Sequence, residues 1–231
     1  MNKYSAQIVY FESEGRQDNL QQVILVIKKS LKRREDLRAL KLVVFTAMGE
    51  GPALAFKELM AYSPKIIAVS FSLDFSVKAV DSEERFFPRI PTQVKKFFAG
   101  VEITIVPPAP LPFDSIEGMD WHNQQMKTVK DTIALFGGGF NACIQAVLRA
   151  CDAGELVPGE RVIAMSGDCA ALMTASTTTK FLTSEGLCIH EILCKPRNFT
   201  IARRPPPTQR HAQEVLPPEK QSKALPDKKE G

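Results

Sequence analysis

The chain has 231 residues, 44% of them apolar, with a formal net charge of +4 and five cysteines. Its length predicts one domain with some additional chain, and no apolar run reaches the roughly 18 residues that a membrane span requires. The segment 203–231 holds seven basic and four acidic residues, so it carries +3 of the net charge. The remaining body is nearly neutral, which excludes the broad basic face of a nucleic-acid-binding domain.

The cysteines are odd in number and form no CxxC pair. This pattern is typical of reduced thiols and predicts a cytoplasmic protein, and residues 1–15 lack the pattern of a secretory signal. One basic run is expected to be the solvated end of a helix rather than a binding patch. It consists of Lys28, Lys29, Lys32, Arg33 and Arg34.

The first half of the chain predicts strands that alternate with helices. A strand over 6–11 precedes a helix over 18–34, for which Asp18 and Gln21 provide a start like a capping box. A second strand over 42–46 passes through a glycine-containing turn into a helix that ends near 61. The third strand, 65–71, is a continuous apolar run, as expected for a strand buried on both faces.

The turn after the second strand is the main candidate binding site. Gly49 and Gly51 can adopt backbone angles that other residues avoid, and Pro52 suits the first position of a helix. The first N–H groups of that helix would then attract an anion, with Thr46 adding a hydroxyl at the strand end. These residues predict a site for a phosphate or a carboxylate. An ordinary strand-to-helix connection without a ligand is the alternative.

The second half predicts a surface excursion over 76–89, a helix over 91–99 and a strand over 101–106. Four prolines in 107–113 predict a rigid surface linker, and 116–122 are expected to be irregular. Helices over 124–136 and 141–153 follow, separated by three glycines. Strands over 161–166 and 187–193 flank a segment, 169–184. Its Thr and Ser residues predict a helix with a polar face, and hydroxyl groups for a ligand are the alternative. The Pro- and Lys-rich composition of 203–231 predicts disorder, so the single domain is expected to span 1–202.

This alternation predicts a three-layer α/β domain with a mostly parallel sheet. Ligands of such sheets bind outside the carboxyl ends of the strands. Loops at that edge, at Ser70, Ser72, Gly167 and Asp168, are therefore expected to complete a site with the turn at Gly49.

Several segments in order resemble a known family: YFESEG, LVVFTAMGEGPALAFKEL, IIAVSF, ALFGGGFNACIQAVLRACDAGELVPGERVIAMSG and CIHEILCKPR. They are similar to free-standing proteins related to the C-terminal domain of pyruvate kinase. The resemblance covers about residues 8–197. It implies a three-layer α/β/α fold whose mixed five-stranded sheet ends in an antiparallel strand. Pyruvate kinase activity is not expected, because that chemistry belongs to a barrel domain that a chain of this length lacks.

The resemblance also implies a ligand. In pyruvate kinases the comparable loop cradles a phosphate of a sugar-phosphate effector, and the matching positions are Thr46, Met48, Gly49, Glu50 and Gly51. The free-standing relatives imply flavin mononucleotide (FMN) in the equivalent cleft. The chain departs from the family after the third strand and in the short stretch that ends at Asp168. These departures motivate a second hypothesis, a regulatory or interaction module without a ligand.

Other polar residues have two interpretations each. Asp168 could bind a ligand hydroxyl or cap a following helix, and Gly137–Gly139 could form a second anion cradle or a simple helix break. Cys188, His190 and Cys194 share one face of the last strand and are expected to be interior side chains rather than zinc ligands.

The expected partner is a phosphorylated small molecule, with no metal, nucleic acid or membrane, and a homo-oligomer is left open. No catalytic constellation stands out in the sequence. A flavin-dependent oxidoreductase is therefore a third hypothesis without a named proton donor.

Overall fold

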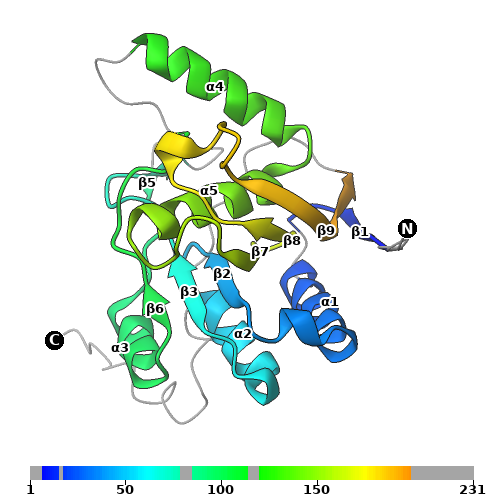
Figure 1. Cartoon of the computed structure of the whole chain (residues 1–231). Helices are drawn as coiled ribbons and strands as arrows, with labels where there is room; N and C mark the ends of the chain where they lie inside the picture. Colours follow the sequence, from blue (N-terminus) through cyan, green and yellow to red (C-terminus); the bar gives the residue numbers. More distant parts are fainter. Residues whose placement is uncertain (1–6, 16–17, 79–84, 114–119, 199–231) are drawn as a thin grey trace, which may run out of the picture.

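A computed structural model of the chain describes residues 7–15, 18–78, 85–113 and 120–198. Within these residues, seven strands form one sheet in the order β1-β9-β8-β7-β2-β3-β6 (Figure 1). Their bounds are β1 Val9–Ser13, β2 Lys41–Phe45, β3 Ile66–Val69, β6 Thr104–Ile105, β7 Arg161–Met165, β8 Ala170–Thr174 and β9 Cys188–Asn198. A separate antiparallel pair, β4 Val77–Lys78 and β5 Arg85–Phe86, lies in the predicted surface excursion.

The sheet is mixed but mostly parallel. Strands β2, β3, β6 and β7 pair in parallel, and so do β1 and β9. Strand β8 pairs antiparallel with both β7 and β9, so β9 runs in the same direction as β7. The expected α/β class with a mostly parallel sheet is confirmed. The expectation of five strands ending in an antiparallel strand is wrong, because the described sheet has seven and β8 is the antiparallel one.

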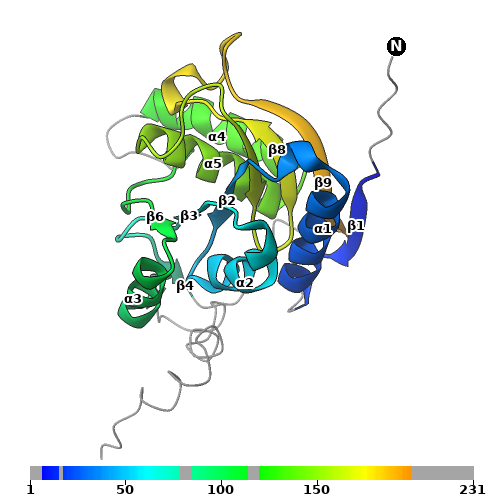
Figure 2. The same cartoon turned by 60° about the horizontal axis from the view of Figure 1, so that its bottom comes forward.

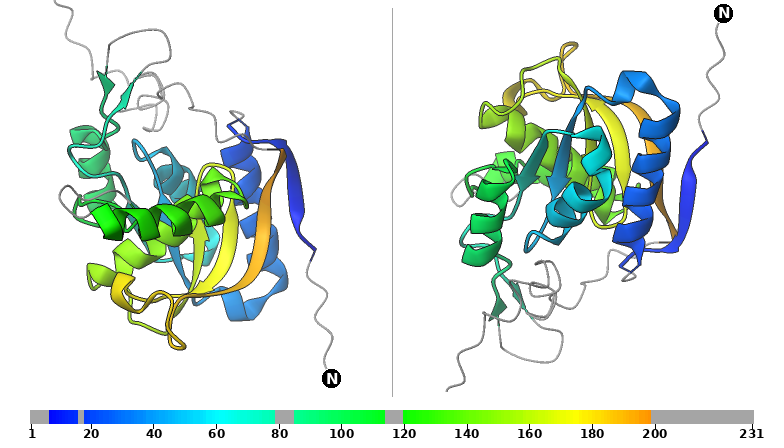
Figure 3. Two further views of the ribbon diagram at one scale, coloured as in Figure 1. Left: turned by 90° about the horizontal axis from the view of Figure 1, so that it is seen from above. Right: turned by 90° about the horizontal axis from the view of Figure 1, so that it is seen from below.

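Helices cover both faces of this sheet, as the two views in Figure 3 show. One face carries α1 Asn19–Arg33, α2 Glu50–Leu59 and α3 Thr92–Gly100. The other carries α5 Gly138–Asp152, and α4 Asp120–Ala134 packs outside α5. Figure 2 shows α1, α2 and α3 together on the first face. Short 3₁₀ turns occur at Glu35–Leu37, Met60–Tyr62 and Thr178–Lys180.

Two apolar cores form because the side chains of a strand alternate between the faces of a sheet. On β2, Leu42 and Val44 face the α1–α3 core, and Val43 between them faces the α5 core. All four residues of β3 are buried, as predicted for a strand covered on both sides. The α5 core also contains Phe113, so the predicted proline linker ends inside the fold rather than wholly on its surface.

Several predicted boundaries shift. Residues 120–122, expected to be irregular, belong to α4, and helix α5 begins at Gly138 rather than at 141. In the segment 169–184, the expected helix is replaced by β8 and a 3₁₀ turn, because Ala170–Thr174 pairs on both sides with other strands. Part of the first predicted strand, most of 116–122 and the whole tail 203–231 lie outside the described residues.

Candidate functional site

The predicted site residues follow three adjacent strands that end at one edge of the sheet. Strand β2 lies between β3 and β7 and is parallel to both. The Thr46 N–H group, directly after β2, donates to the carbonyl oxygen of Val69 at 2.9 Å. Thr46, Ser70 and Ser166 therefore start neighbouring loops, as expected for the carboxyl ends of parallel strands. The end of β1 lies at the same edge, since β1 runs parallel to β9.

The loop after β2 binds an anionic oxygen that belongs to its own chain. The N–H group of Met48 and the hydroxyl of Thr46 each donate to Oε2 of Glu50 at 3.0 Å. The N–H group of Gly49 donates in turn to the Thr46 hydroxyl at 2.9 Å. Glu50 is half-buried and is the first residue of α2. Its carboxylate occupies the position in which the sequence predicts a ligand phosphate or carboxylate.

The two glycines of this loop have separate structural reasons. Gly49 has a φ of +98°, in the region that favours glycine, and precedes α2 as its N-cap. A Cβ at Gly49 would lie 2.6 Å from Cγ1 of Val94, and one at Gly51 would lie 2.9 Å from Cγ1 of Val44. Gly51 is already helical, and Pro52 is the third helical residue rather than the first. Close packing therefore accounts for both glycines without a ligand.

The loop after β3 also satisfies its hydroxyl groups internally. Ser70 donates to the carbonyl oxygen of Ala47 at 3.4 Å, which joins this loop to the one after β2. The Ser72 hydroxyl is buried and hydrogen-bonds the carboxylate of Asp74. That bond lowers the pKa of Asp74, because it stabilises the charged form. The carboxylates of Glu50 and Asp74 thus accept hydrogen bonds from two of the three hydroxyl groups that the sequence assigned to a ligand.

The loop after β7 faces the beginning of α5. Asp168 is buried, and its Oδ2 accepts a bond of 3.4 Å from the N–H group of Gly15 at the end of β1. A Cβ added at Gly139 would lie 1.9 Å from Oδ1 of Asp168 and 2.7 Å from Oγ of Ser166. Strand β8 begins two residues after Asp168, so the helix-capping interpretation is wrong. The carboxylate instead lies against the first turn of α5, where the helix dipole favours negative charge.

Two buried polar atoms at this position have no partner among the described residues. They are the hydroxyl oxygen of Ser166 and the side-chain oxygen of Asn141, the latter in the first turn of α5. Buried polar atoms are ordinarily satisfied by an internal water or another polar group. Gly139 is the glycine that this close packing on polar side chains requires, and Gly137 has a φ of +107°.

Three aromatic rings border the same edge. Phe71 stacks on Phe75, with ring centroids 4.1 Å apart and an interplanar angle of 6°. Phe45, the last residue of β2, meets Phe71 edge to face at 4.9 Å. All three side chains are half-buried. Sequence reasoning missed this cluster, although the phenylalanines at the ends of the second and third predicted strands indicated it.

Sequence reasoning placed Glu50 in the loop but did not recognise it as the internal acceptor. An acidic residue in the first turn of a helix was the available signal.

The expectation that His190 is interior is wrong, since His190 and Cys188 are both exposed, whereas Cys194 is buried.

No protein-family model matches the chain. Over the described residues, no helix has both the length and the apolar character needed to cross a bilayer. The same residues contain no group of three or more His, Cys, Asp or Glu side chains placed to hold a metal ion. The protein is of the α/β class, with an open, mostly parallel mixed sheet. Its candidate site lies at the loops that follow β2, β3 and β7.

Proposed function

We propose that this chain is a small-molecule-binding α/β domain that holds a phosphorylated ligand at the carboxyl ends of β2, β3 and β7. One observation carries this proposal: the Met48 N–H group and the Thr46 hydroxyl converge on a single carboxylate oxygen of Glu50. Donors arranged around an anionic oxygen suit a phosphate oxygen equally well. In the ligand-bound state, the phosphate replaces the Glu50 carboxylate on these donors.

FMN is the leading ligand. The resemblance to the free-standing pyruvate kinase C-terminal-like proteins implies it, and the half-buried rings of Phe45, Phe71 and Phe75 offer an apolar aromatic surface beside the loop. A flat flavin ring packs well on such a surface, because aromatic groups associate by stacked and edge-to-face contacts.

The test is an equilibrium titration of the purified full chain with FMN, in which quenching of flavin fluorescence measures binding. Glu50→Gln removes the competing negative charge with little change in shape. We expect it to tighten FMN binding about tenfold, because displacing a half-buried hydrogen-bonded carboxylate costs on the order of 1–2 kcal/mol. Riboflavin, which lacks the phosphate, should bind more weakly than FMN and gain nothing from the substitution.

Glu58→Gln is the matched control. Glu58 lies on the same helix, but its carboxylate pairs with Lys28 at 3.2 Å rather than with the loop. This variant should bind FMN as the unaltered chain does. Equal affinities for FMN and riboflavin would contradict a phosphate-anchored site, and so would unchanged FMN affinity in Glu50→Gln.

A regulatory or interaction module without a small-molecule ligand is the second candidate. It is favoured by the internal acceptors of Thr46, Ser70 and Ser72, and by the packing that explains the loop glycines. This function predicts that neither the unaltered chain nor Glu50→Gln binds FMN. The substitution would then only lower stability, measured as a reduced midpoint of denaturant unfolding.

A further inference from the structure

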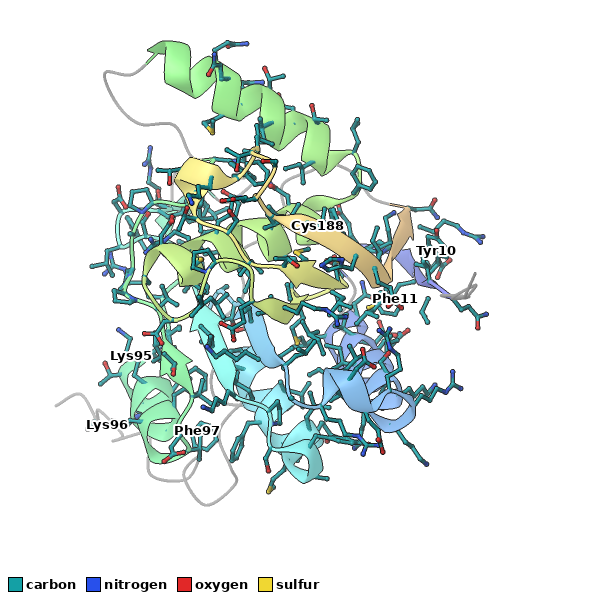
Figure 4. The ribbon with its side chains drawn as sticks, viewed as in Figure 1. Tyr10, Phe11, Lys95, Lys96, Phe97 and Cys188 are labelled. Carbon is teal, nitrogen blue, oxygen red and sulfur yellow. The ribbon has the colours of Figure 1, made fainter. Side chains whose placement is uncertain are left out.

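A cysteine and a histidine lie together at the end of the sheet opposite the proposed ligand site. Cys188 is the first residue of β9, and Figure 4 labels it where that strand begins. Its register partner is Thr174, the last residue of antiparallel β8. Because β8 runs against its neighbours, its carboxyl end lies at their amino-terminal edge. The cysteine and the histidine therefore lie at the opposite edge of the sheet from the loops after β2, β3 and β7.

The three side chains form a connected group. Oγ1 of Thr174 lies 2.6 Å from Nε2 of His190, and Sγ of Cys188 lies 3.9 Å from Nδ1 of the same ring. When Nε2–H donates to the threonine oxygen, Nδ1 carries the lone pair that accepts the thiol proton. A nucleophile, a base and a third group that orients the base are the parts of an activated thiol.

An irregularity in the β8–β9 pairing places His190 beside Thr174 and Cys188. Met173 pairs with Ile189 and Leu172 pairs with Glu191, so His190 is an additional residue without its own partner on β8. Such a bulge leaves one residue out of the ladder and redirects side chains. Thr174 is therefore the register partner of Cys188 and also contacts the ring of His190.

The other four cysteines are buried. Burial raises the pKa of the Cys151 and Cys194 thiols, because the charged thiolate is poorly solvated there. A hydrogen bond with Cys143, together with burial, raises the pKa of Cys169. Since the thiolate is the reacting form, these thiols are protected and the exposed Cys188 is not.

We propose that Cys188 is a reactive thiol, activated by His190, which forms a mixed disulfide with small-molecule disulfides. His190 takes the thiol proton at Nδ1, and the sulfur attacks one sulfur of the disulfide. The new S–S bond forms as the old one breaks, and the leaving thiolate takes the proton from the imidazolium. One thiol and one disulfide give one mixed disulfide and one thiol, so atoms and electrons balance.

Charged side chains on β9, on β7 and in the loop before β9 form ion pairs with other charged side chains. Arg34 contacts both Glu191 and Asp36, and Arg161, the β7 register partner of Thr174, also contacts Asp36. In the loop before β9, Lys180 contacts Glu185 at 3.6 Å. Carboxylates and guanidinium groups do not ordinarily titrate between pH 6 and 9. The comparison with His190→Gln therefore isolates the contribution of the imidazole at each pH.

The test measures the second-order rate with which the full chain reacts with 4,4′-dithiodipyridine, a neutral disulfide, from pH 6 to 10. Release of thiopyridone gives the rate, and the mass of the intact protein counts the modified thiols. We expect one fast thiol that is lost in Cys188→Ser. At pH 7, His190→Gln should react at least about tenfold more slowly, because the thiol then lacks the base that takes its proton. The two rates should converge above about pH 9, where thiols ionise without a base.

Two comparisons separate activation from mere exposure. A thiol placed at the 72% exposed Leu182, as L182C in the Cys188→Ser chain, should react at the rate of His190→Gln. Thr174→Val should slow the reaction at pH 7 and Thr174→Ser should restore it, since only serine retains the hydroxyl that orients the ring. Equal rates for the unaltered chain and His190→Gln at pH 7 would overturn the proposal. A fast reaction that persists in Cys188→Ser would overturn it as well.

The outcome is independent of the proposed ligand site. FMN binding to the loop after β2 does not involve β9, so modification of Cys188 should leave the FMN titration unchanged. Failure of one experiment therefore says nothing about the other.

Discussion

Single residues at the candidate site combine a structural and a binding explanation. Glu50 accepts the loop donors at 3.0 Å and so stabilises the folded loop in the absence of a ligand. The same carboxylate competes with any phosphate for those donors. Under the proposed function, ligand binding and loop stability are therefore opposed at this residue, which is why substitution of Glu50 is more informative than substitution of the glycines.

Gly49 combines a left-handed backbone with crowded surroundings. Gly49→Ala should lower the free energy of unfolding by about 3 kcal/mol, the sum of a left-handed backbone and a crowded Cβ. Gly159→Ala is the matched control, since Gly159 has a φ of +89° but nothing within 4 Å of an added Cβ. It should cost only about 1 kcal/mol. Denaturant unfolding of both variants checks this. Equal losses would mean that contact with Val94 is unimportant.

The first turn of α5 packs closely against the loop that follows β7. Gly138 and Gly139 are consecutive residues of its first turn, but their surroundings differ. A Cβ at Gly138 would have its nearest neighbour at 3.9 Å, whereas one at Gly139 would lie 1.9 Å from Asp168. Only the second glycine is required by the approach of the helix to the loop after β7.

This difference predicts opposite effects of two adjacent substitutions. Gly138→Ala should be neutral or stabilise the fold by up to about 1 kcal/mol, because alanine is the better helix former. Gly139→Ala should destabilise it by about 2–3 kcal/mol, since the buried Asp168 must move. Thermal and denaturant unfolding measure both. A stabilising Gly139→Ala would show that Asp168 is not held against the helix.

The described sheet is covered at its centre and exposed at the edge formed by β1. Strands β2 and β3 have neighbours on both sides and buried side chains on both faces. Among the described strands, β1 pairs with β9 alone, and its residues Val9 and Tyr10 are exposed. Local opening therefore costs least at β1.

Hydrogen exchange followed by mass spectrometry should order the strands accordingly. Peptides that cover Lys41–Phe45 and Ile66–Val69 should exchange most slowly, close to the rate of global unfolding. The peptide that covers Val9–Ser13 should exchange fastest among the strands longer than two residues. Protection of β1 equal to that of β2 would instead indicate that another chain covers this edge of the sheet.

Much of the fold was predictable from local sequence patterns. Apolar runs located β2, β3 and β7, because a strand buried on both faces must be apolar throughout. Helical spacing located α1, α3 and α5 to within a few residues. The alternation of these elements placed the candidate loops at one edge of the sheet, as the parallel pairing confirms. Such features depend on residues close together in the chain.

Other features were decided only by contacts between distant segments. Ala170–Thr174 becomes a strand because β7 and β9 both pair with it, and no local pattern specifies that pairing. The approach of Gly139 to Asp168 and the meeting of Cys188, His190 and Thr174 likewise depend on how the elements pack. The alternation of strands and helices thus determined the α/β class and the location of the candidate loops at one edge of the sheet. Tertiary packing determined which donors, acceptors and thiols meet, because those atoms come from separate elements.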